Sequence, residues 1–440
     1  MAKTRRVIVL CDGTWCGRET NTKSNIYFLA QMIGVNLTQT PAETLSPYLR
    51  ARYFDGVGLG GDFMSYLWNG AFATQAKREW TEVYNFIVQN FDSDSEVQTQ
   101  VWMFGISRGA YMVRSVAGMI NNCGIIKDKT NQRLINQVYD IYQSPHPVNR
   151  PWSEEMKWFR KKASHEVLKP IKFMGLFDTV GSRGVPRLNY NTGSGFEWPE
   201  FYDTNVSSEV ENVYHAVAIH DRFWAFRPCL VSRASKHDRR KDLKIRQKWF
   251  PGCHYDIARQ EFQFFREGGN SLENILFPIL NLFNKTVSPN EQLADLVLLW
   301  MLEGIETVGG GMIIQRDIDD GERDITGAIA AIRNQFPLQR RGSGDMYGDI
   351  LSYLPGGKIL AWFKNLNRTA YAILFNPVDR VIPDPGLGNS LQAAVYNEVY
   401  DYTAQDANIN NVTIRVSACV CPQRYPSETY SNYVTYMNAI

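Results

Sequence analysis

The chain has few of the features that mark secreted or membrane-spanning proteins. Its 440 residues include seven cysteines, too few and too scattered for a disulfide scaffold. No stretch approaches the roughly 18 consecutive apolar residues that a membrane-spanning helix needs. The apolar run that follows the basic N-terminus, residues 7–10, is too short for the core of a signal peptide. These absences predict a cytoplasmic protein.

The net charge is small, and the sequence shows no metal-ligand pattern. The formal net charge is +2, which gives no general case for nucleic-acid binding. Cys419 and Cys421 stand one residue apart, but no second cysteine pair or histidine cluster follows at zinc-ligand spacing. We therefore expect no nucleic-acid partner, no metal and no cofactor, and the oligomeric state stays open.

What the chain does have is an ordered, apolar composition with alternating strand and helix patterns. Hydrophobic residues make up 44% and aromatic residues 13% of a chain long enough for one large domain or two. Apolar strands separated by helices favour an α/β fold, with a mostly parallel sheet covered by helices on both faces. We expect strands at residues 6–11, 51–54, 101–105, 171–177, 213–219 and 244–250, and helices at residues 24–33, 71–90, 108–121, 131–143, 154–163 and 272–283.

The last third of the chain has a different pattern. Beyond about residue 268 the spacing becomes helical and irregular, and glycine and proline clusters such as Gly309-Gly-Gly311 interrupt it. We expect a catalytic core over residues 1–305. Residues 306–440 would then form a C-terminal extension or cap packed on that core.

The most informative stretch is a strand, a tight turn and a helix around Ser107. Residues 101–104 are an apolar run of strand length, Gly105-Ile106-Ser107-Arg108-Gly109 follows, and helical spacing begins at Ala110. This is the layout of the nucleophile elbow of α/β-hydrolases, in which a sharp turn lifts a serine hydroxyl above the sheet. The pattern predicts acyl transfer through a serine ester.

A nucleophilic serine needs a histidine base and an acid to orient it, and α/β-hydrolases order them serine, acid, histidine. Asp178 fits the acid, since it comes at the end of the apolar run 171–177. Among six histidines, His254 lies on a glycine-containing loop after a late strand, where the base belongs. His220, at another strand end, is the main rival.

The oxyanion that forms during acyl transfer needs two backbone N–H donors. We expect one from Arg108, directly after the nucleophile. The second should come from the loop after the first strand, where Gly13 and Thr14 are the candidates and Asp12 can shape the loop by hydrogen bonding. Asp12, His220 and Asp256 are secondary candidates for the site.

Four motifs together resemble one family. They are Cys11-Asp-Gly-Thr-Trp15, Gly105-Ile-Ser-Arg-Gly-Ala110, Leu176-Phe-Asp-Thr-Val-Gly-Ser182 and Trp249-Phe-Pro-Gly-Cys-His-Tyr-Asp256. Their order and spacing are similar to those of the catalytic domain of type VI secretion phospholipase effectors of the Tle class. More broadly, they resemble the α/β-hydrolase family of bacteria and fungi that contains this domain. The resemblance covers roughly residues 5–305 and is specific because it joins several motifs.

The resemblance implies a triad of Ser107, Asp178 and His254, and hydrolysis of carboxylic esters or of the acyl esters of phospholipids. The histidine loop departs from the family pattern, because it continues Asp256-Ile-Ala-Arg259 where a glycine pair is usual. A catalytically disabled binding protein, and an acyltransferase that uses the same triad, therefore stay open as alternatives. An intracellular hydrolase of fungal type fits the length as well as an effector does.

The expected partner is a small-molecule or lipid ester substrate. Residues 233–248 are rich in lysine and arginine. Such a run is most simply a solvated loop and edge strand. It could also attract an anionic lipid, so a transient contact with a membrane surface is a further expectation.

Overall fold

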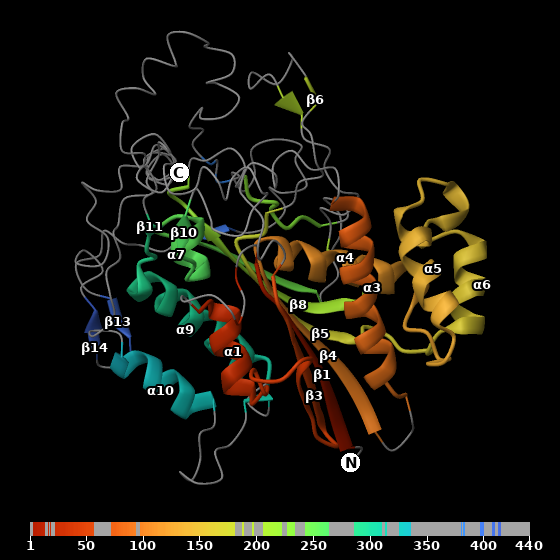
Figure 1. Cartoon of the computed structure of the whole chain (residues 1–440), viewed down its shortest axis with the longest axis horizontal. Helices are drawn as coiled ribbons and strands as arrows, with labels where there is room; N and C mark the ends of the chain where they lie inside the picture. Colours follow the sequence, from red (N-terminus) through yellow and green to blue (C-terminus); the bar gives the residue numbers. More distant parts are fainter. Residues whose placement is uncertain are drawn as a thin grey trace, which may run out of the picture.

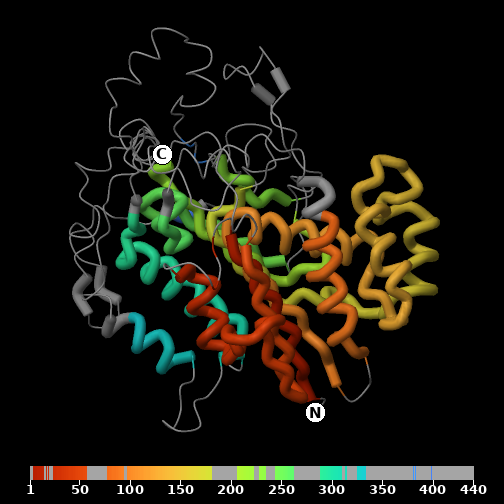
Figure 2. The backbone as a smooth tube through the Cα atoms, viewed as in Figure 1, coloured from red at the N-terminus to blue at the C-terminus, as the bar shows by residue number. Residues whose placement is uncertain are grey.

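A computed structural model gives the architecture (Figures 1 and 2). The structure describes residues 3–13, 16, 18, 23–56, 72–93, 97–180, 187–188, 196–197, 206–221, 227–233, 243–263, 286–309, 313–314, 325–335, 380, 382, 397–399, 407–409 and 412–414. All structural statements concern these residues. Within them, no helix combines the length and the apolarity needed to cross a membrane.

One sheet of eight strands runs through the described part of the chain, in the order β12-β9-β8-β5-β4-β1-β3-β2. Its strands are β1 (Lys3–Cys11), β2 (Ala42–Leu45), β3 (Leu49–Phe54), β4 (Val97–Ile106), β5 (Ile171–Phe177), β8 (Val210–Ala218), β9 (Lys244–Phe250) and β12 (Asn397–Val399). All neighbours run parallel except β2, which is antiparallel to β3. Short antiparallel pairs join β6 (Arg187–Leu188) to β7 (Phe196–Glu197), β10 (Phe262–Gln263) to β11 (Thr286–Val287), and β13 (Ala407–Ile409) to β14 (Val412–Ile414).

Helices cover both faces of the sheet (Figure 1). They are α1 (Asn25–Ile33), α3 (Phe72–Asn90), α4 (Arg108–Cys123), α5 (Gln132–Gln143), α6 (Glu154–Ala163), α7 (His254–Ala258), α9 (Glu291–Thr307) and α10 (Ile325–Gln335), with a 3-10 turn at Pro147–Asn149. Successive side chains of a strand point to opposite faces. Ile8 and Leu10 of β1 accordingly lie in the core under α1, α9 and α10, whereas Val7 and Val9 lie in the core under α3, α4 and α5.

Several of the described helices begin with ordinary capping chemistry. The side chains of Ser24, Asn131 and Ser153 accept backbone N–H bonds at the beginnings of α1, α5 and α6. Two glutamates in the first turn of α6, and basic residues in its last turn, suit the helix dipole. These local signals explain why the predicted helix bounds lie within a residue or two of the observed ones.

The predicted α/β class, with a mostly parallel sheet and helices on both faces, is confirmed. Strands β5 and β9 and helix α6 have the predicted bounds. Strands β2 and β12 and helices α9 and α10 were not predicted as such, and the helix expected at residues 272–283 lies outside the described residues.

The predicted division between residues 305 and 306 stays a prediction. Helix α9 runs through that point to Thr307, and β12 pairs in parallel with β9 in the main sheet. The described part of the last third therefore contributes both a sheet strand and, through Ile325 and Ile329 of α10, core side chains.

The carboxyl ends of the central strands gather the polar residues that the sequence singled out. Asp12 follows β1, Ser107 follows β4, Asp178 follows β5, His220 comes shortly after β8, and His254 comes shortly after β9. Open α/β sheets bind ligands at this edge. The fold thus brings five distant segments to one place.

Candidate active site

Ser107 sits on a strained turn between β4 and α4. Its φ of 55° and ψ of −119° lie outside the region that side-chain-bearing residues usually adopt. Two glycines make the turn possible. A Cβ on Gly105 would come within 2.5 Å of the Gly109 carbonyl oxygen, and one on Gly109 would lie 2.3 Å from the Cys11 carbonyl oxygen. The turn therefore requires small residues on both sides of the serine.

Ser107, His254 and Asp178 form a continuous chain of hydrogen-bonding atoms. His254 Nε2 is 2.9 Å from Ser107 Oγ, and His254 Nδ1 is 2.6 Å from Asp178 Oδ2. The three side chains are almost fully buried, with exposed fractions of 3%, 1% and 0% in that order. This spacing suits proton transfer from a hydroxyl to an imidazole that a carboxylate orients.

The Asp178 carboxylate has two further partners. Its Oδ1 accepts the Ala218 N–H at 3.0 Å, and Arg380 binds both oxygens, Nη1 to Oδ1 at 2.8 Å and Nη2 to Oδ2 at 2.9 Å. Burial alone would raise the pKa of Asp178. The Arg380 charge and the His254 hydrogen bond outweigh burial and hold that pKa well below its ordinary value. Asp178 is therefore ionised throughout the physiological range.

The histidine loop is fixed by two other carboxylates. Asp221 Oδ2 accepts the backbone N–H of His254 at 3.0 Å. Asp256 accepts the N–H groups of Cys253 at 2.9 Å and of Asn290 at 2.7 Å, so it caps α7 and ties it to the start of α9. Asp256, a secondary candidate from the sequence, thus contacts backbone groups of the loop.

The sequence departure after Asp256 has a structural counterpart. Residues 256–258 continue α7, and Arg259 ends it in the left-handed region with φ of 55°. The Arg259 guanidinium forms a buried ion pair with Asp295 of α9. The histidine loop is therefore joined to α9 through a charged side chain.

His220, the rival base, contacts the histidine loop and not Ser107 or Asp178 in any contact described for it. The Nδ1 atom of His220 accepts the Gly252 N–H at 2.8 Å, and the backbone N–H of His220 donates to the Gly252 carbonyl at 2.9 Å. Burial lowers the pKa of His220 to about 3, which keeps it neutral. His220 therefore anchors the turn at Gly252, whose φ of 101° favours glycine, just before His254.

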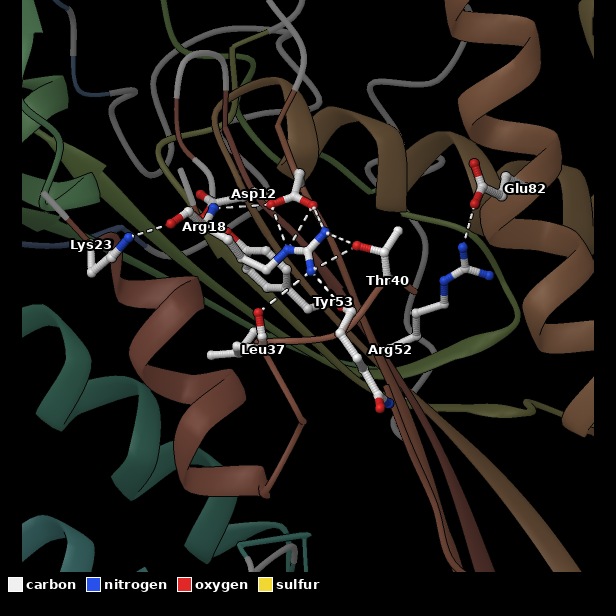
Figure 3. Close-up of polar contacts among 10 residues, drawn as sticks. Asp12, Arg18, Lys23, Leu37, Thr40, Arg52, Tyr53 and Glu82 are labelled. Carbon is white, nitrogen blue, oxygen red and sulfur yellow. Dashed lines mark hydrogen bonds and ion pairs between the residues drawn. The ribbon is translucent and has the colours of Figure 1, made fainter. Parts of the chain in front are cut away.

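Asp12 organises the loop after β1 (Figure 3). Its Oδ1 accepts the Gly13 N–H at 2.8 Å, and its Oδ2 accepts the hydroxyls of Ser24 at 2.6 Å and Tyr53 at 2.5 Å. Burial raises the pKa of Asp12 to about 6, against the opposing effect of these donors.

The Gly13 N–H donates to the neighbouring Asp12 carboxylate, and its role as an oxyanion donor stays a prediction. Gly13 does lie beside the nucleophile, since a Cβ there would be 3.3 Å from Ser107 Cβ and 2.7 Å from Ile106 Cγ2. Arg108 is the first residue of α4, as expected. Thr14 lies outside the described residues.

Arg18 holds the same loop against the β2–β3 side of the sheet (Figure 3). It binds Asp55 at 2.7 Å and also donates to the Leu37 carbonyl and the Thr40 hydroxyl. The polar contacts of Asp12 and Arg18 thus fix the described parts of this loop at both ends.

Two residues of the site were missed by the sequence reasoning. Asp221 follows a strand end and could have been found by the same argument as Asp178. Arg380 lies 202 residues from its partner, in a stretch without periodic pattern, and no sequence signal pointed to it.

One protein similar to this chain comes from yeast. The chain is 28% identical over 168 residues to the uncharacterized protein YEL023C of Saccharomyces cerevisiae, an alignment that covers 37% of this chain and 22% of the yeast protein. The chain thus matches only about a fifth of that relative's length.

Two solved structures have a TM-score of about one third against this chain. An uncharacterized protein from Pseudomonas aeruginosa has 13% identity and a TM-score of 0.33. That match covers 70% of this chain and 46% of the Pseudomonas chain. The Tle1 effector bound to the VgrG spike of the type 6 secretion system has 15% identity and a TM-score of 0.32. That match covers 77% of this chain and 81% of the effector chain. Neither likeness is strong enough to bear on the site. The sequence model of the catalytic domain of Tle1-like type VI secretion phospholipase effectors matches residues 5–304, and the chain belongs to that family.

Proposed function

We propose that the protein is a hydrolase of lipase or phospholipase type that cleaves carboxylic esters, acyl esters of phospholipids in particular, through a serine acyl-enzyme. The observation that carries the proposal is the hydrogen-bonded chain Asp178–His254–Ser107 at the carboxyl edge of the sheet. Membership of a phospholipase effector family supports the choice of lipid esters over other esters.

In the proposed reaction, Ser107 Oγ attacks the ester carbonyl carbon while His254 Nε2 takes the hydroxyl proton. The tetrahedral intermediate collapses, His254 protonates the departing alcohol oxygen, and the acyl group stays on Ser107. A water molecule then gives its proton to His254 and attacks the acyl carbon. The fatty acid leaves, and the proton returns to Ser107 Oγ.

The remaining roles follow from position and charge. Asp178, ionised at neutral pH, holds the imidazole through Nδ1 and stabilises its protonated form during each transfer. The N–H of Arg108, at the start of α4, is the proposed oxyanion donor, and the positive end of the helix dipole favours the same negative charge. Gly13 and Thr14 stay the predicted candidates for the second donor.

The test is covalent labelling with a fluorophosphonate probe, read by intact mass. Wild type should gain one probe mass at Ser107, and Ser107→Ala and His254→Ala should gain none, because labelling needs both the nucleophile and its base. His220→Asn is the matched control. It removes the buried histidine that follows β8, and its amide oxygen can still accept the Gly252 N–H, so this variant should still label. Labelling that survives in Ser107→Ala would overturn the proposal.

The open alternatives have their own outcomes. Well-folded wild type that does not label would favour a catalytically disabled binding protein. Wild type that labels, but releases acyl groups only when an alcohol or amine is added, would favour acyl transfer. Release of fatty acid from phosphatidylcholine or phosphatidylglycerol vesicles in water supports phospholipid hydrolysis.

A further inference from the structure

Among the described residues of the last third of the chain, Arg380 contacts the proposed active site. Arg380 is buried, with 5% of its surface exposed, and it lies against the carboxylate of Asp178. Its two terminal nitrogens bind one carboxylate oxygen each, and Nη1 also donates to the Ala218 carbonyl at 2.7 Å. A planar guanidinium suits this fork, and an ammonium group does not.

The surroundings of His254 are rich in carboxylates. Asp178 binds its Nδ1, Asp221 binds its backbone N–H, and Asp256 lies two residues further along α7. Burial raises the pKa values of Asp221 and Asp256, while Asp178 stays ionised. Negative charge close to an imidazole favours its protonated form, which cannot accept a proton from a serine.

The other titratable groups around His254 add little charge. Burial keeps Cys253 a thiol and keeps His215 and His220 neutral. On the α9 side, Arg259 and Asp295 neutralise each other. Arg380 brings a full positive charge directly against Asp178, and Asp178 and Asp221 both raise the pKa of Arg380 although burial lowers it.

We propose, on the basis of the function proposed above, that Arg380 is a positioning residue of the active site. It fixes the plane of the Asp178 carboxylate, which in turn holds the His254 imidazole against Ser107, and it offsets the surrounding negative charge. The C-terminal third of the chain is on this view part of the catalytic machinery, although the family match ends at residue 304.

The experiment compares Arg380→Gln and Arg380→Lys in the full chain. The first readout is the pH dependence of kcat/KM for a neutral ester between pH 5 and 9. The second is the titration of the His254 imidazole, followed by NMR of nitrogen-labelled histidine in a Ser107→Ala background, which needs no activity. Arg114→Gln is the matched control, because Arg114 is also a buried arginine but donates to the Cys229 and Leu230 carbonyls.

In Arg380→Gln, the acidic limb of kcat/KM and the imidazole titration should both move up by about one pH unit, because a cation next to the orienting carboxylate is lost. In Arg380→Lys the charge remains, so both midpoints should stay. Its plateau kcat should fall about tenfold with little change in KM, because one ammonium group cannot bridge two oxygens. Arg114→Gln should lower stability and leave both midpoints where they are.

Two results would overturn the proposal. One is an imidazole midpoint in Arg380→Gln that equals that of the parent Ser107→Ala protein. The other, which decides the matter if Arg380→Gln does not fold, is a wild-type kcat in Arg380→Lys. Because the titration requires no turnover, the inference on Arg380 can fail while ester hydrolysis stands, and it can be tested even if the wild type proves inactive.

Discussion

The buried carboxyl of Asp12 makes the stability of this protein depend on pH in a defined direction. Its pKa rises from 3.8 to about 6 on folding, chiefly because of burial. The folded state therefore holds a proton between these values that the unfolded state releases. The contribution to the free energy of unfolding is full below pH 3.8 and is lost as the pH rises through 6.

The magnitude follows from the size of the shift. At about 1.4 kcal/mol per pKa unit, the whole effect is about 3 kcal/mol, and about 2 kcal/mol of it falls between pH 4.5 and 7.5. Asp12→Asn removes the titration and keeps the contacts. Its amide oxygen can accept the Gly13 N–H, and its amide nitrogen can donate to the Ser24 and Tyr53 hydroxyls.

Urea unfolding of wild type and Asp12→Asn at both pH values is the assay. Between pH 4.5 and pH 7.5, the free energy of unfolding of Asp12→Asn should rise by about 2 kcal/mol relative to that of wild type. Tyr53→Phe removes a hydroxyl that lowers the pKa of Asp12, so in that variant the dependence should extend to higher pH. A difference between wild type and Asp12→Asn that is the same at both pH values would refute the reasoning.

Three further predictions concern the turn and the histidine loop. The free energy of unfolding of Ser107→Gly should be about 1 kcal/mol higher than that of Ser107→Ala, because glycine relieves the strain at φ 55°. Equal stability of the two variants in urea titrations would contradict this. Gly109→Ala should cost about 3 kcal/mol or more, since its Cβ would lie 2.3 Å from the Cys11 carbonyl oxygen, and a thermal melt like that of wild type would argue against the tight elbow. Arg259→Met should cost about 3–5 kcal/mol by removing the cation that pairs with the buried Asp295 carboxylate; recovery in Arg259→Met with Asp295→Leu is the control, and no recovery would count against the ion pair.

The part of the site that could be predicted from the sequence depends on local signals. Ser107 and Asp178 each follow an apolar strand directly, and His254 follows β9 by a short glycine loop, so parallel pairing brings them to one edge. The fold class is confirmed for the same reason. The catalytic roles of these residues stay a proposal.

The rest depends on contacts that no local pattern encodes. The N–H of Gly13 donates to the Asp12 carboxylate, a contact set by the folded loop, and the role of Gly13 as an oxyanion donor stays a prediction. Helix α9 is buried on nearly all sides, so it lacks the one-sided apolar spacing that identifies surface helices. Arg380 and β12 join the core from positions far along the chain, where only tertiary packing decides the outcome.

The pairing of β12 with β9 has a consequence for how this chain is made. A ribosome that has synthesised everything up to the end of the family match has already released the serine, the aspartate and the histidine. At that moment β9 still lacks its outer neighbour, and its unpaired backbone groups form an open edge that can recruit other chains. β12, which pairs with this edge, begins at Asn397, about ninety residues beyond the end of the family match. Nascent and truncated forms should therefore be the species most prone to aggregate, and a chaperone that shields this edge would favour the native product.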